Sequence, residues 1–138
     1  MSGPDPHDPV ETVLVVDDDV IVRAAIAEYL RTCGFRVLEA VHAEEAQTVL
    51  QSDAMRVDIV LSAAAMRQGV DGFALLRWVH EHRPDVEVVL AGTPGRAAHA
   101  AAELCDSGPT LARPHDPQLV LDRIKRMLVA RKPRNADG

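Results

Sequence analysis

Residues 12–19 carry the sequence TVLVVDDD, a short continuous apolar run followed by three aspartates. A run of this length without polar alternation is typical of a strand buried on both faces, as in a parallel sheet. Helical spacing follows, with an apolar stripe at Val22, Ile26, Tyr29, Leu30 and Cys33. Asp19 is placed to cap this helix at its N-terminus, and Gly34 to end it in a left-handed turn. The stretch therefore predicts a strand, an acidic loop and a helix.

Strand and helix patterns alternate along the rest of the chain. Further strands are expected at 35–40, 57–62, 86–91 and 110–112. Further helices are expected at 44–50, 72–82 and 96–105, and after a cap at Asp116, where Pro117 starts a helix with a buried stripe of Val120, Ile124, Met127 and Leu128. This alternation predicts an α/β fold with a parallel sheet covered on both faces. Function in such sheets is expected at the carboxyl ends of the strands.

Length and charge limit the class of protein. The chain has 138 residues and a formal net charge of -6, an acidic balance that argues mildly against nucleic acid or an anionic membrane as partner. No apolar run is long enough to span a bilayer, and the N-terminus lacks the pattern of a secretory signal. We expect a cytoplasmic protein with one domain at 11–130, between a disordered lead at 1–10 and a polar tail at 131–138. Cys33 and Cys105 are then expected to be two reduced structural thiols.

Four linked stretches carry a family resemblance. They are VLVVDDD at 13–19, VDIVLS at 57–62 followed by Asp71-Gly72, VVL at 88–90, and LARP at 111–114. In this order and spacing they resemble the receiver domain of bacterial response regulators over about residues 12–130. The resemblance implies a flavodoxin-like (CheY-like), doubly wound sheet of five parallel strands in the order 2-1-3-4-5, with five helices.

In receivers, an aspartate that ends the third strand accepts a phosphoryl group. Mg²⁺ held by an acidic pair after the first strand, a hydroxyl ending the fourth strand and a lysine on the fifth strand assist, because the charge on the transferring group must be neutralised. The resemblance places the acidic pair on Asp17 and Asp18 and the acceptor on Ala63. Further departures are Ala91 at the hydroxyl position, Arg113 at the lysine, Thr110 at the aromatic switch position and Arg67 where proline is common. The bond from Arg113 to Pro114 is implied to be cis.

Alanine at position 63 offers neither a nucleophile nor a metal ligand. The loop after it is one residue longer than the commonest pattern, but a register shift by one would place the acceptor on Ser62 or Ala64, and neither is a carboxylate. We expect no required cofactor and, at best, weak Mg²⁺ binding by Asp17 and Asp18. One of the clustered carboxylates is expected to have a raised pKa or to pair with Arg113.

The expected function is that of a stand-alone receiver-like protein in two-component or phosphorelay signalling, which acts by phosphorylation-independent protein–protein interaction and is not an enzyme. Its expected partners are a histidine kinase, a phosphotransfer protein or another response regulator, and neither nucleic acid nor a membrane. The contact face implied by the family is the fourth helix, fifth strand and fifth helix. Both a monomer and a weak homodimer stay open.

Two alternatives accompany this expectation. The first is a phosphoaccepting receiver in which alanine replaces a natural aspartate at position 63; the three further departures in the same site favour natural loss. The second is a small phosphatase dependent on Asp17, because Asp17-x-Asp19 is similar to the nucleophile motif of haloacid-dehalogenase-like phosphatases, although the companion acidic motif is missing.

Two other features have competing interpretations. Residues 92–95 (GTPG) fit a phosphate-cradling loop or, more simply, a strand-to-helix connection. Trp78 fits the rim of the core or a contact with a partner, and the rim is favoured.

Overall fold

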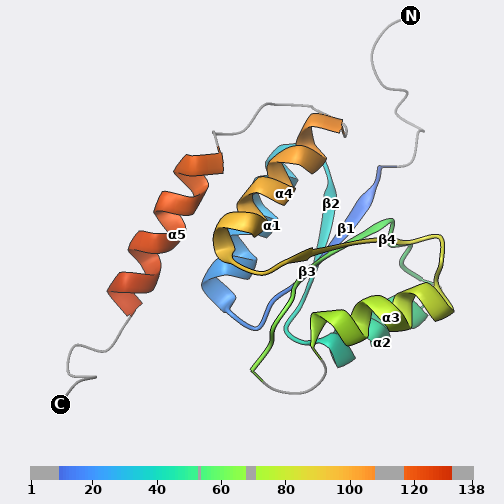
Figure 1. The fold of residues 1–138 in the computed structure, drawn as a ribbon. Helices are drawn as coiled ribbons and strands as arrows, with labels where there is room; N and C mark the ends of the chain where they lie inside the picture. The colour runs from blue at the N-terminus through green and yellow to red at the C-terminus, as the bar shows by residue number, and fades with distance from the viewer. Residues whose placement is uncertain (1–9, 53, 68–70, 108–116, 132–138) are drawn as a thin grey trace, which may run out of the picture.

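The elements follow the predicted alternation of strands and helices. The computed structural model describes residues 10–52, 54–67, 71–107 and 117–131 (Figure 1). Its strands are β1 (Thr12–Val16), β2 (Arg36–Ala40), β3 (Ile59–Ala63) and β4 (Glu87–Ala91). Its helices are α1 (Val20–Thr32), α2 (Ala43–Gln51), α3 (Gly72–His82), α4 (Pro94–Ser107) and α5 (Pro117–Arg131). The α/β class and the five helices are confirmed.

The four strands form one parallel sheet in the order β2-β1-β3-β4. β1 lies inside this sheet and every one of its residues is buried, which is why its sequence is a continuous apolar run. The predicted fifth strand at 110–112, the cis bond from Arg113 to Pro114 and the cap at Asp116 lie outside the described residues, as do the predicted terminal segments apart from Val10 and Arg131.

The predicted ends of α1 are confirmed. The Asp19 carboxylate accepts hydrogen bonds from the backbone N–H of Ile21 (2.9 Å) and of Val22 (3.3 Å). Gly34 follows the helix with a φ of 106°, a left-handed conformation that glycine adopts without steric cost.

The bounds of β2, α2 and β4 differ from the predicted ones by a single residue at one or both ends, and those of β3 and α4 differ by more. β3 begins at Ile59 and ends at Ala63, later than predicted. Asp58 still exchanges backbone hydrogen bonds with Thr12 and Glu87, so the difference is one of formal strand ends. α4 begins at Pro94, because proline is tolerated in the first turn of a helix, where its missing N–H would have no partner.

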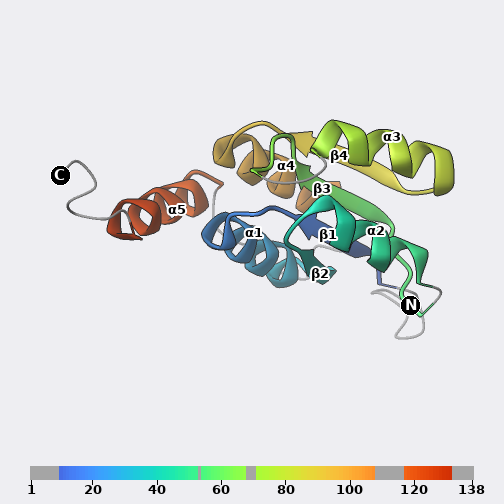
Figure 2. The same ribbon diagram turned by 90° about the horizontal axis from the view of Figure 1, so that it is seen from below.

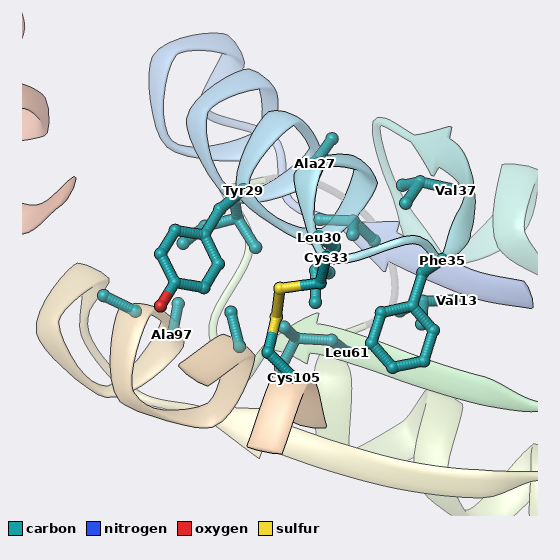
Figure 3. Packing of buried hydrophobic residues seen from close by; sticks show 14 of the residues in the cluster. Val13, Ala27, Tyr29, Leu30, Cys33, Phe35, Val37, Leu61, Ala97 and Cys105 are labelled. Carbon is teal, nitrogen blue, oxygen red and sulfur yellow. A yellow bond between two sulfur atoms is a disulfide. The ribbon is translucent and has the colours of Figure 1, made fainter. Parts of the chain in front are cut away.

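Helices cover both faces of the sheet (Figures 1 and 2). α2 and α3 lie on one face, over a core that includes Leu14, Val16, Val60, Leu75 and Val79. α1 and α4 lie on the other face, and α5 packs against both of them. The core of this second face includes Val13, Val15, Ile26, Leu30, Leu61, Ala101 and Ile124 (Figure 3).

Several predictions about side chains can be compared with this packing. Trp78 is partly buried against the α2–α3 core, as the rim interpretation predicts, and its ring stacks on His82 at 4.4 Å between centroids. In α5, Ile124 is buried and Leu128 partly so, but Met127 is exposed, so the prediction that Met127 is buried is wrong. Met127 is exposed because, among the described elements, α5 packs mainly against α1 and α4 along one side of the helix. No described helix has both the length and the apolar character needed to cross a bilayer.

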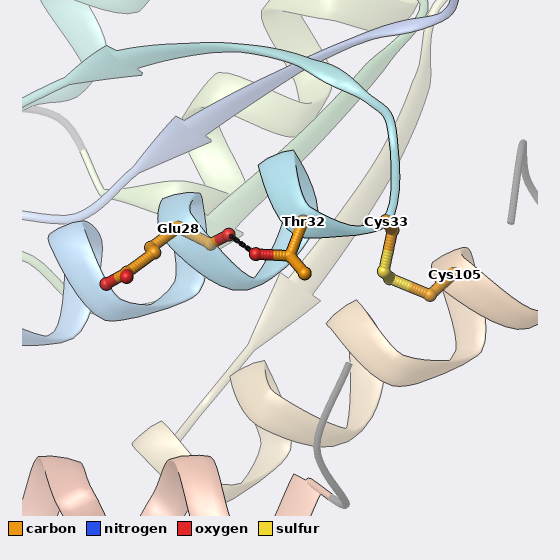
Figure 4. The surroundings of a disulfide bond; sticks show 4 residues. All are labelled: Glu28, Thr32, Cys33 and Cys105. Carbon is orange, nitrogen blue, oxygen red and sulfur yellow. Dashed lines mark hydrogen bonds between the residues drawn. A yellow bond between two sulfur atoms is a disulfide. The ribbon is translucent and has the colours of Figure 1, made fainter. Parts of the chain in front are cut away.

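The prediction of two reduced thiols is also wrong. Cys33 and Cys105 are joined by a disulfide, with their Cα atoms 5.7 Å apart (Figure 4). The two cysteines lie 72 residues apart in sequence, and the packing of α4 on α1 is what brings them together. Sequence spacing alone gives no indication of that contact.

Candidate functional site at the carboxyl edge of the sheet

The strand register gathers three of the predicted site residues. β1 pairs with β3 so that Val16 lies opposite Ser62, and β3 pairs with β4 so that Ala63 lies opposite Ala91. Asp17, directly after β1, therefore borders the same edge. A cavity of about 160 Å³ opens there, lined by Asp17, Asp19, Val22, Ala63, Ala64, Ala65, Ala91, Gly92, Thr93, Pro94, Ala97 and Leu128. Thr110, Arg113 and Pro114 lie outside the described residues.

Asp17 is the half-buried carboxylate of this cavity. Its removal from water raises the pKa of the Asp17 carboxyl above 3.8, and repulsion from Asp18 and Asp19 adds to the rise. The backbone N–H of Asp19, which donates to Asp17 Oδ1 at 2.8 Å, and the charge of Arg23 act in the opposite direction without cancelling the rise. This agrees with the expectation that one of the clustered carboxylates has a raised pKa.

Asp18 is held by the loop that follows β3. Asp18 Oδ2 accepts a hydrogen bond from the backbone N–H of Arg67 at 2.7 Å and lies 3.5 Å from Arg67 Nε. The sequence analysis proposed Arg113 as the cation for the acidic cluster; among the described residues, Arg67 pairs with Asp18 and the charge of Arg23 acts on Asp17. The two loops at the edge are thereby joined.

Ala63 ends β3 with its methyl group at the cavity. Behind it, the loop returns so closely that a Cβ at position 72 would collide with the carbonyl oxygen of Ala63 and lie 3.0 Å from Ala64 Cα. The backbone N–H of Gly72 donates to the carbonyl of Ala64 at 2.9 Å, and Asp71 Oδ1 accepts from the N–H of Ala74 to cap α3. Asp71-Gly72 thus closes the loop against the end of β3.

Thr93, which the sequence analysis named only as part of the loop at 92–95, lines the cavity. Its Oγ1 accepts from the backbone N–H of Arg96 at 3.1 Å, so it caps α4 while lining the cavity. A threonine directly before a proline that opens a helix is a recognisable cap signature and could have identified it. Pro94 and Gly95 belong to α4, which leaves Gly92 and Thr93 as the connection from β4.

The carboxylates present do not fit a resident Mg²⁺ ion. Across the described ranges, no three or more His, Cys, Asp or Glu side chains come together in a way that could hold a metal. Asp17 and Asp18 each already use one oxygen to accept a backbone N–H, whereas Mg²⁺ requires six oxygen ligands in near-octahedral geometry.

Comparisons with known proteins agree with the fold. The receiver protein of a Pseudomonas putida response regulator superposes with a TM-score of 0.57 at 23% identity, covering 86% of this chain and 98% of that one. The response regulator TrrA of Thermotoga maritima, solved in complex with Mg²⁺-BeF, gives a TM-score of 0.53 at 25% identity over 59% of this chain and 68% of that one.

Among curated proteins, the C4-dicarboxylate transport transcriptional regulatory protein DctD of Pseudomonas aeruginosa is 31% identical over 133 residues, which is 96% of this chain but 28% of that protein. The chain thus spans little more than a quarter of that relative. The family model of the response regulator receiver domain matches residues 13–125. Receiver domains of this kind generally interact with histidine kinases and phosphotransfer proteins. The chain belongs to the response regulator receiver domain family, whose members work in two-component signalling.

Proposed function

We propose that this receiver domain signals without accepting a phosphoryl group, by direct contact with a histidine kinase, a phosphotransfer protein or another response regulator. The observation that carries the proposal is the methyl group of Ala63 at the end of β3, beside Asp17 and opposite Ala91. A methyl group cannot form an acyl phosphate, and neither Ala63 nor Ala91 offers an oxygen to a transferring group.

Other carboxylates are poorly placed to replace a missing acceptor. Asp58 lies at the opposite end of β3, where its Oδ2 accepts from the N–H of Thr12 at 2.8 Å and its Oδ1 lies 3.2 Å from Arg56 Nε. Asp71 is occupied as the cap of α3. A phosphoryl transfer to Asp58 would take place far from the acidic pair Asp17 and Asp18. A transfer to Asp71 would remove the N-cap of α3.

We propose further that Mg²⁺ binds weakly and is not required, and the pairing of Arg67 with Asp18 supports this. A guanidinium supplies positive charge that a bound Mg²⁺ would otherwise bring to the acidic cluster. With neither acceptor nor a firmly held metal, we also propose that the domain has no autophosphatase activity and is not an enzyme.

The experiment uses beryllofluoride, which mimics a phosphoryl group by coordinating a carboxylate oxygen. Mg²⁺ and then beryllofluoride are added to the ¹⁵N-labelled chain and to Ala63→Asp, and backbone amide shifts are followed by NMR. The chain as it stands is expected to show no change at residues 63, 91 and 93 beyond that caused by Mg²⁺ alone. A saturable response of this chain to beryllofluoride would overturn the proposal.

Ala63→Asp separates the alternative. If the variant binds beryllofluoride and its α4 amides shift with it, the remaining site is competent, and a receiver whose natural aspartate was replaced becomes the better account. If the variant does not respond, the departures at 91, 67 and 113 have removed the chemistry as well, as natural loss predicts.

A further inference from the structure

The disulfide joins two helices that both border the site cavity. Cys33 is the C-cap of α1 and Cys105 lies near the end of α4, and both are buried, at 0% and 5% exposure (Figures 3 and 4). The opposite ends of the same helices line the cavity beside Asp17, through Val22 on α1 and Ala97 on α4. The covalent link therefore fixes one wall of the site relative to the other.

The position of α4 conflicts with the handedness expected for a fifth strand. From β1 the chain passes over α1 to β2, in one direction along the sheet; from β2 to β3 and from β3 to β4 it moves in the other direction, over α2 and α3 on the opposite face. A parallel strand added beyond β4 by a right-handed crossover would be reached through a helix on the α2–α3 face. α4 lies on the α1 face instead. Among the described elements, α4 thus lies on the face opposite to the one that such a crossover would use.

Apart from the disulfide, α4 packs on α1, α5 and the sheet with small side chains and with Leu104, which is partly buried against the same core. The buried side chains of α4 are those of Ala97, Ala98, Ala101 and Cys105. Alanine methyl groups bury far less apolar area than the Val, Ile and Leu side chains with which α1 meets the same core. α5 already reaches this core with Ile124 and, partly buried, Leu121 and Leu128, and these larger side chains could cover it in place of α4.

We propose that Cys33 and Cys105 form a redox-modification site, a latch that holds α4 on the α1 face when oxidised and releases it when a dithiol reduces it. A thiolate of the dithiol attacks one cysteine sulfur, the S–S bond breaks, and the second thiolate displaces that cysteine from the mixed disulfide. Two electrons and two protons pass to Cys33 and Cys105, which become thiols, and the dithiol becomes a disulfide. This inference goes beyond the proposed function and does not rest on it.

The release of α4 changes what the domain presents to partners. In the oxidised form the Ala-rich face of α4 is covered by α1 and the sheet. In the reduced form this face of α4 becomes available, and the cavity loses the wall that Pro94 and Ala97 provide. Within a reducing compartment, a disulfide that does form is typically transient and redox-sensing, which suits this role.

Tyr29 is a reporter for the test, because it is the sole tyrosine in the sequence and its ring, 8% exposed, points toward Ala97 (Figure 3). NOEs from the Tyr29 ring to α4 methyl groups, together with amide hydrogen exchange, are measured on the full chain before and after dithiothreitol. Intact mass confirms that the chain gains two hydrogens on reduction. Reduction is expected to abolish these NOEs and to speed exchange of α4 amides by about tenfold or more, as for local opening, while β1, β3 and Trp78 stay unchanged.

The double variant Cys33→Ser/Cys105→Ser is the control, and it should match the reduced chain and ignore dithiothreitol. The inference is overturned if the NOEs and the α4 protection are the same in both redox states, if the whole domain unfolds on reduction, or if air or a mild oxidant produces no disulfide. The comparison of the unsubstituted chain with and without reductant decides the matter even if the variant does not fold.

Discussion

Asp17 is a side chain whose surroundings work against its charged form. It is half-buried beside two further aspartates, and its pKa is raised chiefly by its removal from water. A carboxyl group whose pKa is higher in the folded than in the unfolded state lowers stability when it is ionised. That loss is absent below its ordinary value, develops as pH rises, and is complete above the folded-state pKa.

Asp17→Asn is therefore expected to raise the melting temperature near neutral pH. The gain should shrink as pH falls through the raised pKa of Asp17 and vanish below the ordinary value of 3.8, where both forms of the protein carry a neutral side chain. Thermal denaturation in EDTA across acidic to neutral pH measures it. Asp85→Asn, at an exposed carboxylate, controls for a general loss of negative charge. A gain independent of pH would contradict this explanation.

Arg67 competes with cations for Asp18. Its guanidinium is 72% exposed, and exposed ion pairs contribute about 0.2–1 kcal/mol, so Arg67→Ala should tighten Mg²⁺ binding by at most about fivefold. Isothermal titration calorimetry at fixed ionic strength measures the change. Arg77→Ala removes an exposed positive charge from α3 and should leave Mg²⁺ affinity unaltered. Equal effects of the two variants would show that net charge alone is responsible.

At the scale of the elements, the turn into α3 requires a glycine at position 72, because there is no room for a side chain there. A Cβ at position 72 has no room beside the Ala63 carbonyl, whereas a Cβ at Gly92 meets nothing within 4 Å. Gly72→Ala should lower the free energy of unfolding by about 1–3 kcal/mol, the range for overpacking a close contact. Gly92→Ala should change it by less than about 0.5 kcal/mol. Urea denaturation of both distinguishes them, and a Gly72→Ala protein as stable as Gly92→Ala would show that the loop can move aside.

Thr93 lines the cavity and caps the N-terminus of α4. Thr93→Ala removes the oxygen that accepts from the N–H of Arg96, and loss of such a cap costs about 0.5–2 kcal/mol of stability. Thr93→Ser keeps the hydroxyl and should restore most of that loss. Denaturation combined with exchange of the Arg96 amide measures both. If alanine and serine behave alike, the hydroxyl does not stabilise the helix.

Sequence patterns located the elements whose boundaries have local causes. β1, its acidic end, the Asp19 cap and the turn at Gly34 follow from the apolar run and from residues that act on their immediate neighbours. The start of α3 likewise has a local cause, because Asp71 caps its N-terminus. The start of α4 was missed because proline commonly interrupts a helix and only less often begins one. The elements thus became predictable wherever a short-range interaction fixed them.

At the scale of the whole molecule, the sequence could not show which face of the sheet α4 covers. It also could not reveal the disulfide or the contact between Asp18 and Arg67. The apolar stripe of α4 indicates which side of the helix is buried, but it does not choose between the two faces of the sheet. The pairs Cys33–Cys105 and Asp18–Arg67 join residues far apart in the chain, and no spacing rule connects them. The position of Ala63 beside Asp17 was anticipated, because parallel strands end at one edge whatever their order.

The most direct measurement of the central claim is the intact mass of this chain after incubation with acetyl phosphate and Mg²⁺. A domain that acts by contact alone is predicted to keep its mass unchanged, while a receiver with an aspartate acceptor, treated in parallel, gains one phosphoryl group. A matching gain on this chain, removed by hydroxylamine as an acyl phosphate is, would contradict the account.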